Sequence, residues 1–480
     1  MAMQIERTSA GPARPKGGVK LRSDPRSNPS QPALESANSD EFGKWNRATR
    51  ILFRICFCYF ALYGLYIFSI LIALVLRDLR GKPPFFPVEA GLHGVVPWVG
   101  RHLLGIRQPI DLAYGFSADG LFDWVEHFCF VVAALIGALI WSMLDSKRTD
   151  YRRPHAWLNL FLRLTLAATM FSYGFDKVFP LQFHSITRMD LVQLLGNLNH
   201  YQLMWRFMAA SPGYTILSGS LEVLGGILSL IPRLSNLGAV LCVLVLSNVV
   251  ALNIAYNVDV KLFSFNLLLM AIFLAAPEVP RLARILVLNR PAFPLRSVPL
   301  SERKWIDKGA RILQAALGVC LLLICLVDSA SRYTRIQRAS AVAIPLQGIW
   351  TVDEFSASGE PQHSLFTQTL AHDLHVGTGD DRWARLVFDA PGEAAIQLRN
   401  GEVDYIAIDL GKTATTAELS DSGDPDWKGK LTIEQPQPNL LNLTGVVNGV
   451  TVSAKLHRMD ESQFDLKNEK VSLVDDLPSH

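Results

Sequence analysis

One carboxylate stands inside a long apolar stretch of this chain. Glu222 lies near the middle of residues 217–232, LSGSLEVLGGILSLIP. A charge in hydrocarbon is costly, so such a residue faces other protein and usually has a task. Small residues occur at helical spacing on the same face, where a neighbouring helix could approach closely; they are Ser218, Gly225, Gly226 and Ser229. The pattern predicts that Glu222 points into a helix bundle.

Two further polar residues are predicted to lie near Glu222. Counting the helical rise from the middle of each apolar stretch places Asn248 at a similar depth and Arg163 about 7 Å away along the bundle. The long Arg side chain could cover that distance. A network of Glu222, Asn248 and Arg163 could clasp the helices together, or it could relay protons or hold a ligand. The residues alone leave both alternatives open.

A second group of ionisable residues flanks the apolar stretches on one predicted side of the membrane. Its members are Asp123, Glu126, His127, Asp176, Lys177, Asp259 and Lys261. They could line a shared polar entrance, although Lys177 could instead anchor its helix at the interface together with Tyr173 and Phe179. The candidate ligand-binding residues are therefore Arg163, Tyr173, Asp176, Lys177, Glu222, Asn248, Asn253, Lys261, Glu126 and His127.

Sequence motifs for common catalytic chemistry are absent. The chain contains no GxSxG, P-loop, dinucleotide-binding or HExxH pattern. All six cysteines fall in apolar stretches without a CxxC pair, whereas disulfide exchange needs an accessible thiolate and a partner. His372, Asp373 and His375 could ligate zinc, but a solvated turn is the favoured interpretation of that spacing. No catalytic residue and no metal site is assigned, and no cofactor is identifiable.

Seven apolar stretches must position these residues. Half of the 480 residues are hydrophobic and only 19% are charged, which is typical of a membrane protein with a soluble part. We expect membrane spans at about 51–76, 121–144, 157–179, 213–231, 236–256, 262–279 and 309–330. Residues 88–106, between the first two spans, are apolar but contain Pro97 and Arg101. We therefore expect them to lie along the membrane surface, at its exocytoplasmic interface.

The orientation of these spans follows from the distribution of Lys and Arg. The tail 1–50, the 145–156 loop and the 283–308 loop are rich in Lys and Arg, whereas the loops on the other side are poor in them. Basic loops stay in the cytoplasm, so the N-terminus is predicted to be cytoplasmic and the C-terminal region exocytoplasmic. The tail is predicted to be disordered and basic, without a signal peptide, and nothing in it indicates nucleic-acid binding.

Residues 340–480 differ in character from the rest. Alternating runs such as GIWTVDEF, WARLVFD, AAIQLRN, VDYIAIDL, KLTIEQ, LLNLTGV, TVSAKLHR and QFDLKN predict seven or eight short strands. Asn448–Gly449 between two runs is a strong hairpin signal. A small antiparallel barrel or sandwich is expected, and Gly348–Ile349–Trp350 faintly resembles the start of a lipocalin. The predicted fold class is thus a polytopic α-helical membrane protein with an exocytoplasmic all-β domain.

Three segments together resemble the DoxX-like membrane family. They are RLTLAATMFSYGFDKVFPLQF (163–183), SGSLEVLGGILSLIPRLSNLGAVL (218–241) and NVVALNIAYNVDVKLFSFNLLLMAIFLAAPEVPRL (248–282). The residues that match the family pattern are Arg163, Gly174, Lys177, Glu222, Gly225, Gly226 and Arg233. The resemblance implies a four-helix membrane bundle over residues 157–282. The spans in 51–144, the last span at 309–330 and the β domain resemble a larger bacterial subgroup of that family, which implies location in the bacterial inner membrane.

Two functions remain as alternatives. The resemblance implies a subunit of a membrane redox system whose bundle binds a quinone or a small sulfur or thiol compound, with a redox protein as partner. Because the chain lacks its own cofactor motif, any enzymatic role would be that of an accessory oxidoreductase subunit. The alternative is a non-catalytic assembly or cargo factor whose β domain holds an exocytoplasmic protein. In both cases the lipid bilayer is the surrounding partner.

Overall fold

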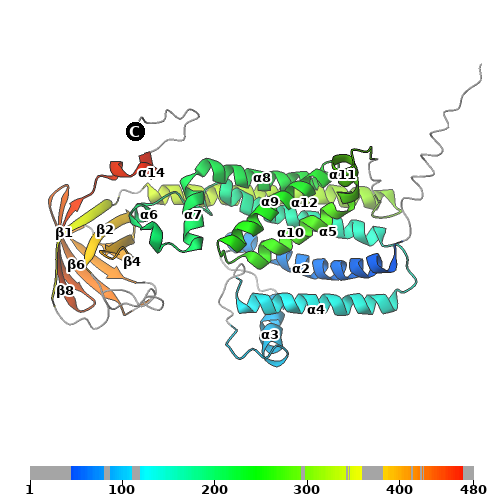
Figure 1. The fold of residues 1–480 in the computed structure, drawn as a ribbon, viewed down its shortest axis with the longest axis horizontal. Helices are drawn as coiled ribbons and strands as arrows, with labels where there is room; N and C mark the ends of the chain where they lie inside the picture. Colours follow the sequence, from blue (N-terminus) through cyan, green and yellow to red (C-terminus); the bar gives the residue numbers. More distant parts are fainter. Residues whose placement is uncertain are drawn as a thin grey trace, which may run out of the picture.

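The computed structural model describes residues 45–80, 87–110, 119–292, 298–341, 344, 346–358, 382–411, 414–421, 424 and 426–468. A bundle of long helices lies at one end of the molecule and a β-barrel at the other (Figure 1). The predicted fold class is confirmed, and of the two β architectures it is the barrel that forms. Most of the predicted tail, and His372, Asp373 and His375, lie outside the described residues.

Six helical segments are long and apolar enough to cross a membrane, counted within the ranges given above. They match six of the seven predicted spans. In order they are α2 (Arg47–Arg80), α4 (Leu121–Leu144), α8 (Pro212–Leu230), α9 (Ser235–Ala255), α10 (Lys261–Ala275) with the turn η2 (Ala276–Glu278) and the short helix α11 (Val279–Leu286), and α12 (Lys304–Ser340). The chain is therefore a multi-pass membrane protein in contact with the lipid bilayer.

The remaining predicted span lies in α5 (Arg152–Val178), which is not apolar enough to qualify by composition. This helix packs against α2, α8, α10 and α12, and from Leu164 to Phe171 every residue is buried. A helix enclosed by other helices needs no uniformly apolar surface, because its neighbours shield its polar residues from lipid. That α5 itself crosses the membrane stays a prediction.

Glycines bring α5 and α8 into backbone contact. A Cβ atom on Gly219 would lie 2.4 Å from the carbonyl oxygen of Gly174, and one on Gly226 would lie 2.7 Å from the Phe171 ring. Only residues without a side chain allow this spacing, as in other closely packed membrane helices. The contact sets the register of the two helices and thereby decides which of their side chains meet.

Short elements join the bundle to the barrel. Between α5 and α8 the chain forms α6 (Arg188–Val192), the turn η1 (Leu195–Asn197) and α7 (His200–Ala210), and Figure 1 shows α6 and α7 between the long helices and the strands. The segment predicted to lie on the interface forms α3 (Pro87–His102), which packs on α4 through Val96, Val99 and Val125.

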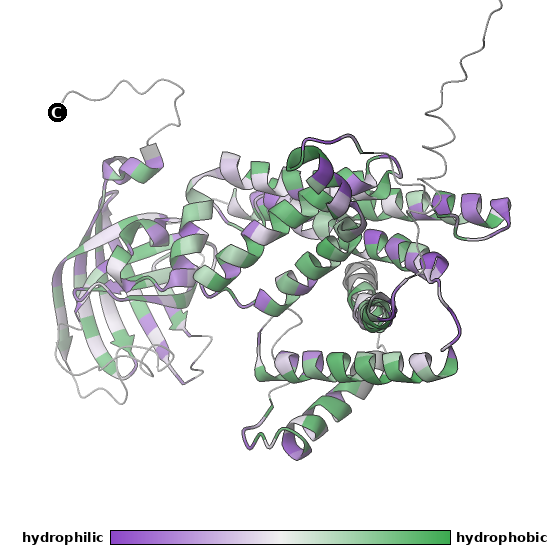
Figure 2. Ribbon diagram, turned by 45° about the vertical axis from the view of Figure 1, so that its right-hand side comes forward, coloured by the Kyte–Doolittle hydropathy of each residue, from purple (hydrophilic) through white to green (hydrophobic). Residues whose placement is uncertain are grey.

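Eight antiparallel strands close into an up-and-down barrel in chain order, with β1 paired to β8. The strands are β1 (Gly348–Ser358), β2 (Trp383–Ala390), β3 (Glu393–Leu398), β4 (Val403–Leu410), β5 (Thr416–Ser420), β6 (Lys428–Gln437), β7 (Leu440–Val447) and β8 (Val450–Arg458). Apolar and polar residues alternate along the strands, whereas apolar colour predominates along the long helices (Figure 2). Alternation directs one face inward, where Trp350, Trp383 and Trp427 are fully buried.

Two details of the predicted strands need correction. The run QFDLKN is not a strand, because its residues lie in the turn η3 (Glu461–Gln463) and the helix α14 (Asp465–Asn468). Since β1 and β8 pair with each other, the closed barrel has no edge to accept another strand. The missing strand is β5, whose five residues are too few to stand out in the sequence.

The predicted hairpin at Asn448–Gly449 is confirmed. Both residues have positive φ, 47° and 82°, as this turn requires.

Candidate functional site

A buried ion pair joins α5 to α8 at the centre of the candidate site. Lys177 Nζ donates to both carboxylate oxygens of Glu222, at 2.8 and 2.9 Å. The two side chains are only 8% and 3% exposed. The Tyr173 ring, whose centroid lies 5.9 Å from Nζ, borders the ammonium group one turn earlier on α5. Each charge is thus satisfied by the other in a region shielded from water and lipid.

This ion pair borders a small cavity of about 80 Å³. The walls come from α5, α7, α8, α9 and α10, and they are mostly apolar. The polar lining comprises Thr169, Tyr173, Lys177, Gln182, Tyr214, Ser218, Glu222, Asn248, Asn253 and Ser264. Asn253 Nδ2 donates to Ser264 Oγ at 3.0 Å, which holds α9 to α10. Gln182 Oε1 is buried and has no hydrogen-bond partner among the described residues.

An apolar cluster covers the barrel-facing end of the cavity. Phe183, Met204, Met208 and Val258 are buried together, and the Trp205 ring packs edge-on against Phe183 with centroids 5.1 Å apart. These side chains come from the segment between α5 and α8 and from the turn before α10. We call this cluster the roof; it separates the ion pair from the space towards the barrel.

Arg163 does not join Glu222. The predicted network of Glu222, Asn248 and Arg163 is not formed, because Lys177 takes both carboxylate oxygens. Arg163 lies 14 residues before Lys177 on the same helix, which separates them by about 21 Å along its axis, and it lines a different pocket. Depth counting from span midpoints failed here because the α5–α8 register depends on the glycine contacts.

The predicted polar entrance divides into separate pairs. Asp176 turns away from Lys177 towards α12, where it accepts hydrogen bonds from Arg332 and from Ser329 Oγ, the latter at 2.9 Å. The backbone N–H and Nζ of Lys261 donate to Asp119 Oδ2, at 2.7 and 3.4 Å. Neither Asp176 nor Lys261 lines the cavity.

Glu126 and His127 face α2 and not the cavity. His127 Nδ1 contacts the Asp123 carbonyl oxygen at 2.7 Å, and its ring packs 5.4 Å from the ring of Tyr63. Glu126 is buried on the same helix. Of the ten candidate residues, the cavity brings together five, which are Tyr173, Lys177, Glu222, Asn248 and Asn253.

Three of the pairings were missed by sequence reasoning: Lys261 with Asp119, Asp176 with Arg332, and Lys177 with Glu222. Asp119 and Arg332 are ordinary charged residues outside the apolar cores, and nothing local indicates which helix end they meet. For the Lys177–Glu222 pair a signal did exist. Gly174 precedes Lys177 by three residues and Gly219 precedes Glu222 by three, so a glycine contact between the two helices places the ionisable residues side by side.

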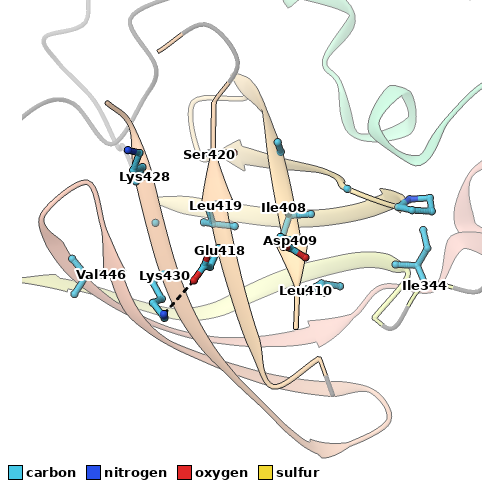
Figure 3. A pocket seen from close by; sticks show the side chains of 14 residues that line it. Ile344, Ile408, Asp409, Leu410, Glu418, Leu419, Ser420, Lys428, Lys430 and Val446 are labelled. Carbon is cyan, nitrogen blue, oxygen red and sulfur yellow. Dashed lines mark hydrogen bonds and ion pairs between the residues drawn. The ribbon is translucent and has the colours of Figure 1, made fainter. Parts of the chain in front are cut away.

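A wider hollow, of about 1060 Å³, lies against β4, β5 and β6 of the barrel. Its lining includes the exposed side chains of Asp409, Glu418 and Lys430, and Figure 3 shows Glu418 and Lys430 pointing towards each other. Their 3.2 Å ion pair is about 70% exposed, and such pairs contribute little. Within the described part of the chain, no three His, Cys, Asp or Glu side chains gather as a metal site would need.

One part of the chain is similar to a known protein. Over 112 residues it is 33% identical to the uncharacterized protein YwoB of Bacillus subtilis strain 168. The matched stretch is 23% of this chain and 71% of YwoB. No family model matches the chain, and no solved structure matches it.

Proposed function

Because this chain belongs to the family of the uncharacterized Bacillus subtilis protein YwoB, we propose a function from the site itself. The protein is a DoxX-like membrane protein whose bundle binds a small ligand beside Lys177 and Glu222. It serves as an accessory, ligand-binding subunit of a membrane redox system. In this proposal it lies in the bacterial inner membrane, with the N-terminus in the cytoplasm and the barrel outside.

The observation that carries the proposal is that the ion pair borders a cavity. A purely structural ion pair between helices should be closely surrounded by protein groups. Buried charges are stabilised well only when their remaining donors and acceptors also find hydrogen-bond partners. Here the pair faces open space, and Gln182 Oε1 in the same wall lacks a partner among the described residues. Buried polar atoms normally have partners, so a bound molecule that donates a hydrogen bond to Gln182 would complete the site.

The cavity volume favours one ligand class over another. A cavity of this kind holds one water molecule in about 10–15 Å³, so 80 Å³ admits a compact molecule with only a few heavy atoms. A small sulfur or thiol compound matches that space, whereas a quinone head group would require the roof to open. The largely apolar walls suit a compact ligand with one polar end, which Lys177 or Gln182 would orient.

The alternative function is an assembly or cargo factor. One observation favours it, namely that the barrel packs on α6 through Met189, Val192, Ile349 and Val387. An exocytoplasmic protein held by the barrel would then be carried next to the bundle. In that case substitutions on the barrel surface would impair function, whereas conservative changes beside the cavity would not.

The test compares Glu222→Gln and Lys177→Met with Asp176→Asn as the matched control. Asp176 adjoins Lys177 on α5 but does not line the cavity. For each full-length variant, the membrane level and the complementation of a deletion strain are measured, and small molecules extracted from the purified protein are identified by mass spectrometry. We expect Glu222→Gln and Lys177→Met to lose complementation and the co-purified compound by more than any fall in their membrane levels explains.

Asp176→Asn should retain both. If Glu222→Gln and Lys177→Met complement fully, the cavity is not a functional site and the pair is a clasp. Recovery of a quinone from the wild type, with no sulfur compound, would contradict the ligand class while keeping the site.

A further inference from the structure

A second pocket, of about 460 Å³, lies at the end of the bundle away from the barrel. One face of α5 forms a wall of it, with residues at helical spacing: Arg152, His155, Ala156, Asn159, Leu160 and Arg163. The other walls come from the α8–α9 turn, the end of α10, the segment around Leu300, and α12, which contributes Arg311 and Gln314. The volume falls in the range of about 300–1,000 Å³ that is usual for ligand sites.

The charge of this pocket is predominantly positive. Three arginines line it, together with His155 and one carboxylate, Glu278. Glu278 is already engaged, because Asn236 Nδ2 donates to it at 2.5 Å and Arg281 at 3.2 Å. Arg311 is held by Asp307 at 3.0 Å. Arg152 pairs with Asp150 at 3.7 Å. Among the described residues, Arg163 is therefore the arginine of this pocket that has no carboxylate partner.

Arg163 has an unpaired donor that a bound anion could satisfy. Its Nε is buried and has no hydrogen-bond partner within the described ranges. A guanidinium group stays charged at any physiological pH, so Arg163 cannot escape the cost of burial by losing its proton. It shares the pocket with Arg311, another cation. Because Arg311 already pairs with Asp307, an anion bound in the pocket would chiefly supply acceptors to Arg163.

From these observations we propose that this pocket binds a phosphate group. Arg presents a planar fork of donors that matches phosphate oxygens, and Asn159 and Gln314 add amide groups to the walls. The surrounding residues favour the head group of an anionic phospholipid as the source of the phosphate. Trp157 on α5 and Trp305 on α12 are exposed near the pocket, and exposed Trp is characteristic of the depth of lipid head groups.

The proposal is independent of the ligand beside Lys177 and Glu222. It concerns the opposite end of α5, so that loss of one site leaves the other intact. Basic pockets between membrane helices are a known way to hold phosphorylated head groups, and here the pocket would tie α5, α9 and α12 together at that end.

The experiment uses the full-length protein in detergent, with native mass spectrometry to count bound lipid. Phosphatidylglycerol is titrated against phosphatidylcholine, and in a separate arm inorganic phosphate is titrated against chloride while the melting temperature is followed. The variant is Arg163→Gln. Its matched control is Arg153→Gln, which removes an exposed arginine of the same helix that pairs with Glu302 outside the pocket.

We expect the wild type and Arg153→Gln to prefer phosphatidylglycerol, and Arg163→Gln to bind it at least about tenfold more weakly, as loss of a charged hydrogen bond implies. If the two lipids bind equally but phosphate raises the melting temperature in an Arg163-dependent way, the source is soluble phosphate and the site stands. Equal binding by Arg163→Gln and the wild type in both arms would overturn the proposal.

A second variant keeps the test decisive if Arg163→Gln does not fold. Arg152→Gln changes a residue at the more exposed rim of the same wall, where folding should be unaffected. A smaller loss of phosphatidylglycerol or phosphate binding is expected for Arg152→Gln. Binding equal to that of the wild type in both arms would again contradict the site.

Discussion

The barrel and the helix bundle fill their interiors in opposite ways. Inside the barrel, Trp350, Trp383 and Trp427 are packed among aliphatic side chains, and an eight-stranded barrel is just wide enough for side chains to fill it. Inside the bundle, Lys177 and Glu222 border a cavity. A charged pair at that position is not needed for packing, since apolar residues of similar volume often stabilise a fold as well.

We infer from this difference that the barrel interior serves stability, whereas the bundle interior holds the proposed ligand site. The interior of the barrel is the source of its own stability, and its outer surface carries the contacts to α6. The bundle retains groups that cost stability, which is the usual sign of a functional site. Substitutions should therefore separate stability effects in the barrel from functional effects in the bundle.

The largest effect is expected for Trp383→Ala in the barrel. It removes a fully buried side chain of the core, and such a change lowers the free energy of unfolding by about 3–5 kcal/mol. Pulse proteolysis of the full chain should show cleavage within the barrel at lower denaturant concentration, with the bundle unchanged. Val446→Ala, at an exposed position, is the control. Equal destabilisation of the bundle would contradict the separation of the two regions.

Lys177→Met should lower the free energy of unfolding of the bundle by a similar amount, about 3–5 kcal/mol. The substitution leaves the buried Glu222 carboxylate without its partner. The double variant Lys177→Met with Glu222→Leu should recover most of that loss, yet remain inactive. Unfolding in mixed micelles, followed together with complementation, checks both statements. A double variant that regains function would show that the pair acts only as a clasp.

Gly219→Ala should have an intermediate effect. The added methyl group would lie 2.4 Å from the Gly174 carbonyl oxygen, so α5 and α8 must separate, at a cost of about 1–3 kcal/mol. The same unfolding measurement applies, with Gly213→Ala as the control because a methyl group added there would meet no atom within 4 Å. Equal stability of the two variants would exclude the tight helix contact.

The smallest effect concerns the docking of the barrel on α6. Arg188 donates to Asp389 at 3.1 Å and to Glu461 at 2.7 Å. Burial raises the pKa of Glu461, but the hydrogen bonds and charges of Lys467 and Arg188 outweigh it, so this pKa lies below its usual value of 4.5. A lowered folded-state pKa stabilises the docked form above pH 4.5, and this contribution is lost as the pH falls through the lower value.

Arg188→Ala should therefore weaken docking by about 1–2 kcal/mol at neutral pH and reduce its sensitivity to acid. Hydrogen exchange of the α6 amides between about pH 3 and pH 7 measures both effects. Unchanged acid sensitivity in Arg188→Ala would show that other carboxylates control the docking.

Much of this architecture could be predicted from local patterns. The apolar stretches indicated six of the helices, and alternation indicated seven of the eight strands. The predicted third span, in α5, stays a prediction, because this helix is less apolar than the six others and is enclosed by its neighbours. β5 was missed because its five residues are too few to show a clear alternation. The run QFDLKN was mistaken for a strand because barrel closure, not local preference, decides where the last strand lies.

By itself, the sequence determined that Glu222 is buried, that small residues surround it, and that Asn448–Gly449 forms a turn, because these depend on spacing along one element. The tertiary structure alone decided that the partner of Glu222 is Lys177 and not Arg163. It also decided that Asp176 turns to α12 and that Arg163 lines a separate basic pocket. Which side chains meet depends on the register between helices, and that register arises where Gly174 and Gly219 touch, 45 positions apart in the chain. Each glycine stands three residues before its ionisable residue in the sequence, but only the fold shows that the two glycines meet.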